Sequence, residues 1–287
     1  MRPVTSRALA ARGGKAARQR GGLGQAPVQV LGLGLLALLA WPGSTLAAQP
    51  ETYSIGVEDI DYLPVSAYRD GAWVGVLPEL LDAFAADEGL RFEYRPLPVS
   101  RLLRSFLNGE IDFKLPDHPD WQNDKRKDLE IHYSHPLLAF TDGTLVRPER
   151  MGEDQAAIRT LATVIGFTPW AWQEPINQGR VRLRESLDLT SLLRQTLAGR
   201  VDAAYASIEV ATWQLEHDLD QAGALVFDPG LPHARDHYHL STLKHPTVLR
   251  ALDRWLERSS DKVAAIKADW GIEADDPNGT DPRDNAD

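Results

Sequence analysis

A short phrase that occurs twice places the strongest constraint on the fold of this chain. Its copies are LNGEID at 107–112 and LAGRVD at 197–202, and each runs directly into a mostly apolar segment. Each copy also follows apolar residues at helical spacing, and glycine can adopt the left-handed backbone that ends a helix. The pattern predicts a helix, a glycine stop and a buried strand in both halves. Two such halves indicate paired α/β lobes, and the cleft between lobes is a common site for small ligands.

The first 48 residues have the pattern of a secretory signal peptide. They carry six basic residues and no acidic one, and an apolar run at 30–41 is followed by Pro42, Gly43 and small residues. A positive end, an apolar core and a small-residue exit are the parts of such a leader. A retained membrane anchor is the alternative, but these twelve apolar residues are fewer than the roughly 20 that span a bilayer. We expect cleavage after Ala47 or Ala48 and a periplasmic protein.

The charge and the absence of cysteine exclude several classes of partner and linkage. The chain contains no cysteine, so it has neither a disulfide framework nor a lipid-bearing cysteine. Removal of the leader leaves 25 basic against 41 acidic residues, a formal charge of −16. Nucleic acids and anionic membranes attract basic proteins, so neither is expected as a partner. The remaining residues, about 239, suffice for two lobes of ordinary size.

Strands and helices alternate in the first half of the mature chain. Pro78 suits the first turn of a helix, Gly89 suits its end, and Ser100 is a candidate cap for the next helix. The predicted order is strand, helix, strand, helix, strand, over 53–60, 78–88, 91–97, 100–108 and 111–115. This order is typical of a mostly parallel sheet.

The second half repeats this rhythm between two extended segments, 132–146 and 238–243, that could cross between lobes. Strands are predicted at 161–165, 181–183, 203–205 and 224–227, and helices at 189–197, 208–219 and within 247–270. The expected division is a signal peptide at 1–48, a first lobe at 49–143 and 240–272, and a second lobe at 144–239. The acidic tail at 273–287 is expected to be disordered.

Six motifs, in their order and spacing, carry a resemblance to a known family. They are Asp61-Tyr62-Leu63-Pro64, the loop from Asp70 to Gly75, Leu107–Asp112, Ser134-His135-Pro136, Gly166-Phe167-Thr168 and Gly199–Tyr205. With them the chain resembles the bacterial periplasmic solute-binding proteins of the amino-acid type, extracellular solute-binding protein family 3. The resemblance covers nearly the whole mature chain. It implies an α/β, two-lobe, periplasmic-binding-protein-like (type II) fold with two hinge-crossing strands.

The resemblance also implies roles for individual residues. Tyr62 stands where the family has an aromatic ring that packs on the ligand, and Thr168 where a hydroxyl and the amides of a helix start hold a carboxylate. An anion at a helix start meets unpaired N–H groups, so this role is chemically sensible. The family's Thr-x-x-Arg clamp has no clean match at 116–121, and Ser207 replaces an aspartate that pairs with an α-amino group.

Lys114 lies within an otherwise apolar strand, and Asp117 follows at the end of that strand. A buried lysine needs a partner, so Lys114 could reach the cleft and supply the missing cation, or it could extend to solvent at the strand end. Asp117 could bind a ligand donor, because ligands gather at the carboxyl ends of strands in open α/β sheets, or it could cap a turn. The basic run at 125–127 indicates a solvated loop face, although it could also supply the clamp.

The remaining candidates are aromatic or hydroxyl side chains. Trp121 and Trp170 are candidates for stacking on a ligand, whereas Trp172 is expected to pack in the core. Tyr205 and Ser207 end the second repeated strand, in the mirror position of Pro116 and Asp117, and could instead serve packing and capping. Together with the positions above, the predicted ligand-binding set is Tyr62, Lys114, Asp117, Trp121, Thr168, Trp170, Tyr205 and Ser207.

Four histidines, at 233, 237, 239 and 245, lie close together in the sequence but lack the ligand spacing of a zinc site. We therefore expect no metal and no cofactor. The chain also has no Gly-rich phosphate loop and no Gly-x-Ser-x-Gly elbow.

These observations predict a periplasmic solute-binding protein and not an enzyme. We expect a monomer that traps a small polar ligand, amino-acid-like or an organic acid, and hands it to an ABC transporter permease. One alternative is a dehydratase on the same fold, with Asp117, Glu79 or Glu209 as general acid or base. Another is a periplasmic sensor component that signals through a separate membrane partner.

Overall fold

The computed structural model describes residues 50–122, 125–126 and 129–272. The predicted signal peptide at 1–48 and the predicted disordered tail at 273–287 lie outside these residues. Among the helices of the described part, none combines the length and the apolar character that crossing a membrane requires.

The first lobe is built on a parallel sheet. Strand β1 (Glu51–Glu58) lies between β4 (Leu90–Leu97) and β5 (Phe113–Asp117) and pairs with both in parallel. Helix α1 (Val76–Glu88) connects β1 to β4, and α2 (Val99–Leu107) connects β4 to β5, as predicted. A small hairpin precedes α1 and consists of β2 (Ala67–Arg69) and β3 (Ala72–Val74).

The second lobe repeats this arrangement. Strand β8 (Thr160–Val164) pairs in parallel with both β9 (Arg182–Ser186) and β10 (Ala203–Ser207). Its helices lie between and after these strands: η4 (Trp170–Trp172), α3 (Gln173–Asn177), α4 (Leu189–Leu197), α5 (Ile208–Trp213) and the π-helical turn η5 (Gln214–Asp218). The connection from the first lobe adds η2 (Pro148–Arg150) and η3 (Gln155–Ala157).

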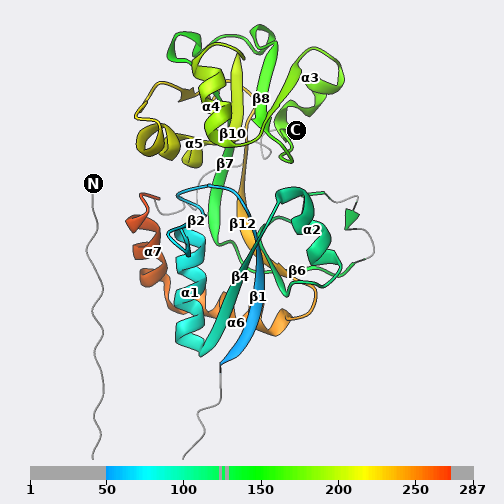
Figure 1. Cartoon of the computed structure of the whole chain (residues 1–287), viewed down its shortest axis with the longest axis vertical. Helices are drawn as coiled ribbons and strands as arrows, with labels where there is room; N and C mark the ends of the chain where they lie inside the picture. The colour runs from blue at the N-terminus through cyan, green and yellow to red at the C-terminus, as the bar shows by residue number, and fades with distance from the viewer. Residues whose placement is uncertain (1–49, 123–124, 127–128, 273–287) are drawn as a thin grey trace, which may run out of the picture. The chain divides into compact units, whose positions relative to one another are not determined.

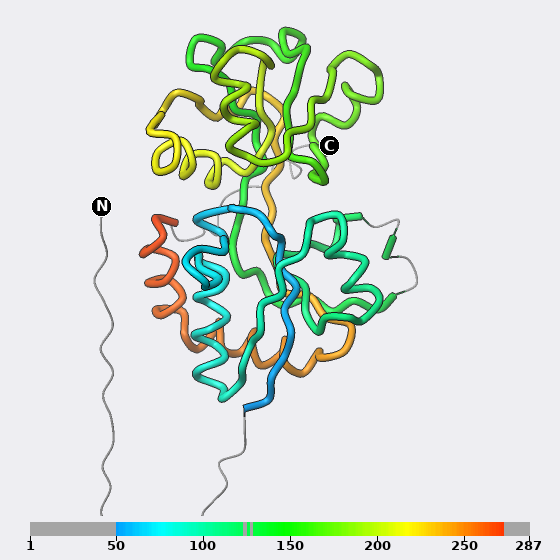
Figure 2. Tube along the Cα trace, viewed as in Figure 1, coloured from blue at the N-terminus to red at the C-terminus, as the bar shows by residue number. Residues whose placement is uncertain are grey.

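Two long strands connect the lobes, and they run side by side in Figure 1 and Figure 2. Strand β7 (Leu138–Val146) pairs antiparallel with β10, with β12 (Ala234–Thr242) and with β11 (Val226–Phe227). The first part of β12 pairs with β7, and its last part pairs with β5 and with β6 (His132–Tyr133). The crossing strands therefore tie the two sheets into one hydrogen-bonded path.

The repeated phrase has the same local structure in both lobes. Gly109 and Gly199 have φ angles of 70° and 66°, in the left-handed region that side chains other than glycine rarely adopt. In each lobe this glycine separates a helix that ends at Leu107 or Leu197 from a fully buried strand. The predicted order of helix, glycine and strand is confirmed twice.

The described part of the chain ends with two helices that pack on the first lobe (Figure 1), α6 (Pro246–Arg258) and α7 (Ser260–Asp269). The fully buried Trp255 of α6 contacts Phe84 of α1, with ring centroids 5.9 Å apart. These helices complete the apolar cluster that encloses β1 and β5. The return of the chain to the first lobe thus supplies part of that lobe's core.

One local prediction is wrong. Ser100 does not cap α2, because the helix begins at Val99 and its N-cap position is Pro98. The segment predicted to be extended at 132–146 forms two strands, β6 and β7, and both pair with β12.

Candidate functional site

A cavity that is partly open to solvent lies where residues of both sheets and both crossing strands meet. Its lining comprises Glu58, Tyr62, Val99, Lys114, Pro116, Trp121, Gln122, Asp142, Thr163, Gly166, Phe167, Thr168, Trp170, Tyr205, Ala206 and Tyr238. The carboxyl ends of β1, β5 and β10 all reach it, as is usual for ligand sites in open α/β sheets.

Aromatic rings form much of the wall. Tyr62, just after β1, meets Phe167 of the second lobe edge to face, with ring centroids 5.8 Å apart. Trp121 lies 6.0 Å from the ring of Tyr238 on the crossing strand β12. Trp170 stands at the edge of the cavity and remains about half exposed. The rings come from both lobes and from the crossing strand β12, so a ligand between them would contact both lobes and this strand.

Two carboxylates that were not predicted from the sequence face the cavity. Burial raises the pKa of Glu58, at the end of β1, to about 7, and the negative charge of Asp117 adds to this shift while Lys114 opposes it. Burial also raises the pKa of Asp142, on β7, to about 7, and the charges of Glu209 and Glu58 add to this shift. Glu58 is the last residue of β1 and Asp142 lies in the middle of β7, so both carboxylates are carried by strands, as Lys114 is.

Lys114 lines the cavity but its charge is already paired. Its ammonium group donates to the Asp117 carboxylate at 2.8 Å and to the Pro116 carbonyl at 2.7 Å. Arg126 binds the same carboxylate through two nitrogens, at 2.7 and 3.0 Å, and Ser241 donates to it as well. These cations and hydrogen bonds hold the pKa of Asp117 below its usual range, although burial alone would raise it.

This pairing corrects the sequence interpretation of the basic loop. Arg126 was predicted to lie on a solvated face, but it is only 7% exposed, because its guanidinium reaches inward to Asp117 and Tyr133. Lys125 is exposed as predicted, and Lys127 lies outside the described residues.

Six of the eight predicted ligand-binding residues line the cavity: Tyr62, Lys114, Trp121, Thr168, Trp170 and Tyr205. The other two, Asp117 and Ser207, are fully buried and are not part of the lining. Ser207 caps α5, because its hydroxyl accepts from the Val210 amide at 3.3 Å and donates to Glu209 at 2.8 Å. Asp117 lies behind the cavity wall, where its carboxylate pairs with the ammonium group of Lys114.

The turn at Thr168 leads into a short helix only. Three residues of 3₁₀ helix, Trp170–Trp172, follow it, and the five-residue helix α3 comes next. The predicted anion cradle at a helix start therefore has few aligned amides and a weak dipole behind it. Trp172 packs in the core as predicted, where its indole N–H donates to the Thr144 hydroxyl at 2.8 Å.

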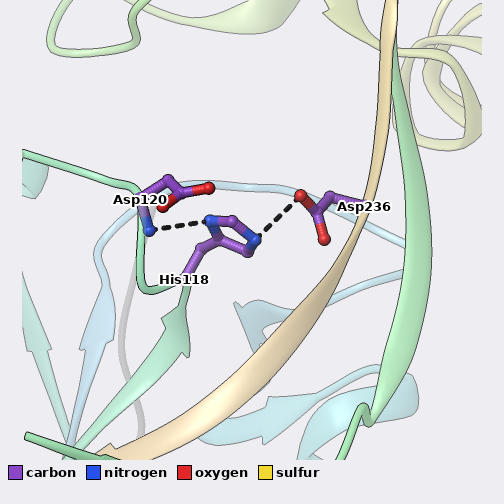
Figure 3. A group of neighbouring side chains, drawn as sticks. All are labelled: His118, Asp120 and Asp236. Atoms are coloured by element: carbon purple, nitrogen blue, oxygen red, sulfur yellow. Dashed lines mark hydrogen bonds and ion pairs between the residues drawn. The ribbon is translucent and has the colours of Figure 1, made fainter. Parts of the chain in front are cut away.

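One cluster could be mistaken for a metal site. His118, Asp120 and Asp236 bring ligand atoms within 4.8 Å of one another, the only such group among the described residues, and it contains none of the four histidines that lie close together in the sequence. As Figure 3 shows, the backbone N–H of Asp120 donates to Nδ1 of His118 at 3.1 Å, and Nε2 of His118 lies 2.9 Å from the Asp236 carboxylate. Both ring nitrogens are thus engaged, and the cluster links the loop after β5 to the crossing strand β12.

The lobes also touch directly beside the cavity. The Gln214 amide donates to the Asp61 carbonyl at 3.0 Å, and Arg69 lies 3.4 Å from Asp218. Arg69 also pairs with Asp61 at 2.7 Å. These contacts join the loop after β1 to η5 and define the edge at which the two lobes meet.

Comparison with known proteins agrees with this architecture. The model of the bacterial extracellular solute-binding proteins, family 3, matches residues 54–272. The chain therefore belongs to this family, and the resemblance inferred from its motifs is confirmed. No curated protein is similar to it in sequence at a significant level.

Several solved structures share the two-lobe fold. The arginine-, lysine-, histidine-binding protein of Geobacillus stearothermophilus is 20% identical, with a TM-score of 0.62 over 78% of this chain and 97% of that one. An ancestral amino-acid-binding protein, a precursor of cyclohexadienyl dehydratase, is 18% identical, with a TM-score of 0.60 over 76% and 95%. The VFT2 domain of BvgS from Bordetella pertussis is 18% identical, with a TM-score of 0.58 over 76% and 93%.

Proposed function

We propose that this protein captures a small polar, amino-acid-like molecule in the cavity between its lobes, outside the cytoplasmic membrane, and presents it to a membrane transporter. One observation carries the proposal: the cavity described above is lined by side chains from both lobes and both crossing strands. A ligand bound there holds the lobes together, and a transporter can recognise that closed state. Family membership supports the transporter as partner.

The aromatic rings are proposed to make most of the contact with the ligand. Tyr62 and Trp121 stack on it from the first lobe, and Tyr205 and Trp170 approach from the second, with Thr168 donating a hydrogen bond. Lys114 contributes through its hydrocarbon stem and its position against the Trp121 ring, 5.4 Å from the ring centroid. The division at 143/144 and 239/240, which falls within β7 and β12, is proposed as the hinge.

The carboxylates predicted for a dehydratase do not reach the cavity. Of the three carboxylates considered for a dehydratase, Asp117 is paired behind the wall, Glu209 is bonded to Ser207 and Thr141, and Glu79 is exposed on α1. None of them lines the cavity. The family and its structural neighbours are mostly binding proteins, and this chain is a binding protein and not an enzyme. No feature of the described residues favours a sensor.

The test is equilibrium binding to the purified protein. Amino acids, organic acids and amines are screened by thermal shift, and hits are titrated calorimetrically. At least one compound should raise Tm in a saturable way and be recovered unchanged. The Trp121→Ala variant should lose that shift, whereas Tyr68→Ala, which removes a ring 60% exposed and outside the cavity, should keep it. A screen in which no compound stabilises the protein contradicts the proposal.

A further inference from the structure

The described lining of the cavity has more acidic than basic side chains, and only the acidic ones are free to pair with a charged ligand. Its ionisable lining consists of Glu58, Asp142 and Lys114, together with the phenols of three tyrosines. Among the described residues, neither Glu58 nor Asp142 has a basic side chain within 4.0 Å, and no hydrogen bond is made to either carboxylate group. Lys114 is committed to Asp117 and to a carbonyl oxygen. The unpaired charge in this wall is therefore negative.

A ligand carboxylate finds no available cation among the described residues of this wall. Lys114 is the one basic side chain among the described lining residues, and Arg126 behind it forms a two-nitrogen pair with the same Asp117 carboxylate. Recruiting either cation for a ligand would leave Asp117, which is fully buried, without part of its compensation. Breaking a buried pair in this way is strongly unfavourable. The helix start after Thr168 is too short to replace a cation.

The same wall suits a positive group. Glu209, on α5, adds a third negative charge next to Asp142, and it raises the pKa of that residue. Around the carboxylates stand the rings of Tyr62, Trp121 and Tyr238, whose faces attract cations within about 6 Å of the ring centroid. Trp121 already accepts one such contact from Lys114. Rings and unpaired carboxylates together form a site for an organic cation, whereas a bare metal ion needs converging oxygen ligands.

We propose that the ligand is a small organic cation that lacks a carboxylate, with an ammonium or guanidinium group held between Glu58 and Asp142 and against the surrounding aromatic rings. The inference rests on the proposed function, because it names the class of molecule that the same cavity binds. Within the amino-acid-like ligands of the proposed function, it specifies amines that resemble amino acids but have no carboxylate.

Matched pairs of compounds that differ in one carboxylate test the proposal. Agmatine is compared with arginine, putrescine with ornithine, and choline with glycine betaine, by calorimetric titration of the purified protein at pH 8. In at least one pair the cation should bind about tenfold tighter or more than its carboxylated partner, because the carboxylate has to be desolvated without a counterion. The choline pair distinguishes a quaternary ammonium from a group that donates hydrogen bonds.

Variants locate the charge that is recognised. Glu58→Gln and Asp142→Asn should each weaken binding of the preferred cation by about tenfold or more, because each removes one of the two unpaired charges. Asp120→Asn is the control: it also removes one negative charge from the same region, but Asp120 is exposed and outside the lining, so affinity should change less than about twofold. Both cavity variants replace a carboxylate by an amide of similar shape, and retained Tm shows that they fold.

The outcomes separate this inference from the function on which it rests. Tighter binding of the carboxylated member in every pair that binds overturns the inference and leaves the solute-binding function intact. Equal binding of both members, or unchanged affinity in the cavity variants, also overturns it. If no cation and no amino acid binds at all, both the inference and the proposed function fail.

Discussion

Asp112 in the first lobe and Asp202 in the second accept nearly the same set of hydrogen bonds. One carboxylate oxygen of Asp112 accepts from the backbone N–H and the hydroxyl of Ser54, and one of Asp202 accepts from the same two groups of Thr160. A basic side chain lies on the other oxygen in both cases, Arg150 on Asp202 and His245 on Asp112. In each lobe the aspartate of the repeated phrase is therefore an anchor that fixes the start of its strand to the neighbouring strand, β1 in the first lobe and β8 in the second.

The opposite ends of the two repeated strands differ. Strand β5 ends in Pro116 and in Asp117, which gathers Lys114 and Arg126 into a buried ionic cluster. Strand β10 ends in Ser207, an uncharged helix cap. The repeated phrase thus gives both lobes the same local structure, whereas the residues at the ends of the two strands differ between the lobes. A repeat can identify the architecture without identifying the ligand.

The largest effect is expected from breaking the ionic cluster. Asp117→Ala leaves two buried cations without their carboxylate and should lower the free energy of unfolding by about 3–5 kcal/mol. The mirror variant Ser207→Ala removes only a helix cap and should cost about 1 kcal/mol. Urea unfolding of both variants measures the contrast. Equal losses would mean that the two strand ends contribute alike, against our comparison.

The next effect is a dependence of stability on pH. Glu58 has a pKa of about 7 in the folded protein against 4.5 for an unperturbed glutamate, so the folded state binds more protons than the unfolded state between these values. The contribution of Glu58 to stability is therefore greatest below the lower value and is lost as pH rises through 7, a change of about 3 kcal/mol from this residue alone. Asp142 acts in the same direction.

Urea unfolding at pH 5 and pH 8 checks this prediction. The carboxylates with lowered pKa, such as Asp112 and Asp202, complete their titration below this window. Glu58 faces Lys114, Asp117 and Asp142, so Glu58→Gln should reduce the pH dependence and stabilise the protein at pH 8. A variant whose stability falls between pH 5 and pH 8 as steeply as that of the parent protein would contradict the assignment.

The anchors should give equal and intermediate effects. Asp112→Ala and Asp202→Ala each remove a carboxylate that accepts several hydrogen bonds, and each should lower the free energy of unfolding by about 2–3 kcal/mol. Chemical denaturation of the pair measures both values. A difference larger than about 1.5 kcal/mol between them would show that the anchors are not equivalent, since such bonds contribute about 1 kcal/mol each.

The smallest effect is expected at the two glycines. Gly109→Ala and Gly199→Ala place a side chain on a left-handed backbone, which costs about 1–2 kcal/mol in each lobe. Asparagine tolerates this conformation better than alanine, so Gly109→Asn and Gly199→Asn should recover part of the loss. Thermal unfolding with paired variants resolves these differences. Alanine variants as stable as the parent would argue against a required left-handed turn.

Much of the fold could be predicted because its signals are local. The helices that end at Gly89, Gly109 and Gly199 follow from apolar spacing and from the backbone freedom of glycine, and the structure has helix ends there. The helices within 247–270 follow from the same spacing. The division of the segment 132–146 into two strands, with β6 ending at Tyr133, could not be predicted, because it depends on how β6 pairs with the distant strand β12.

The site was only partly predictable. Tyr62 was found through the family resemblance, and Trp121 and Trp170 because tryptophans in loops and turns are candidates for ring stacking on a ligand. Glu58 and Asp142 were missed, because a single acidic residue at the end or in the middle of a strand gives no indication of which face it occupies. Arg126 was misplaced for the opposite reason: a run of basic residues indicates a surface, and its buried partner is nine residues away.

Local patterns in the chain were enough to establish paired α/β lobes, the ends of most helices and a family resemblance, because these depend on spacing within a few turns. The availability of each charge depended on contacts between distant strands. Lys114 is paired with Asp117, which also binds Arg126. Glu58 from β1 and Asp142 from β7 meet at the cavity, and among the described residues neither has a direct ion pair. Coulomb interactions act through space, so only the folded chain decides which charges remain for a ligand.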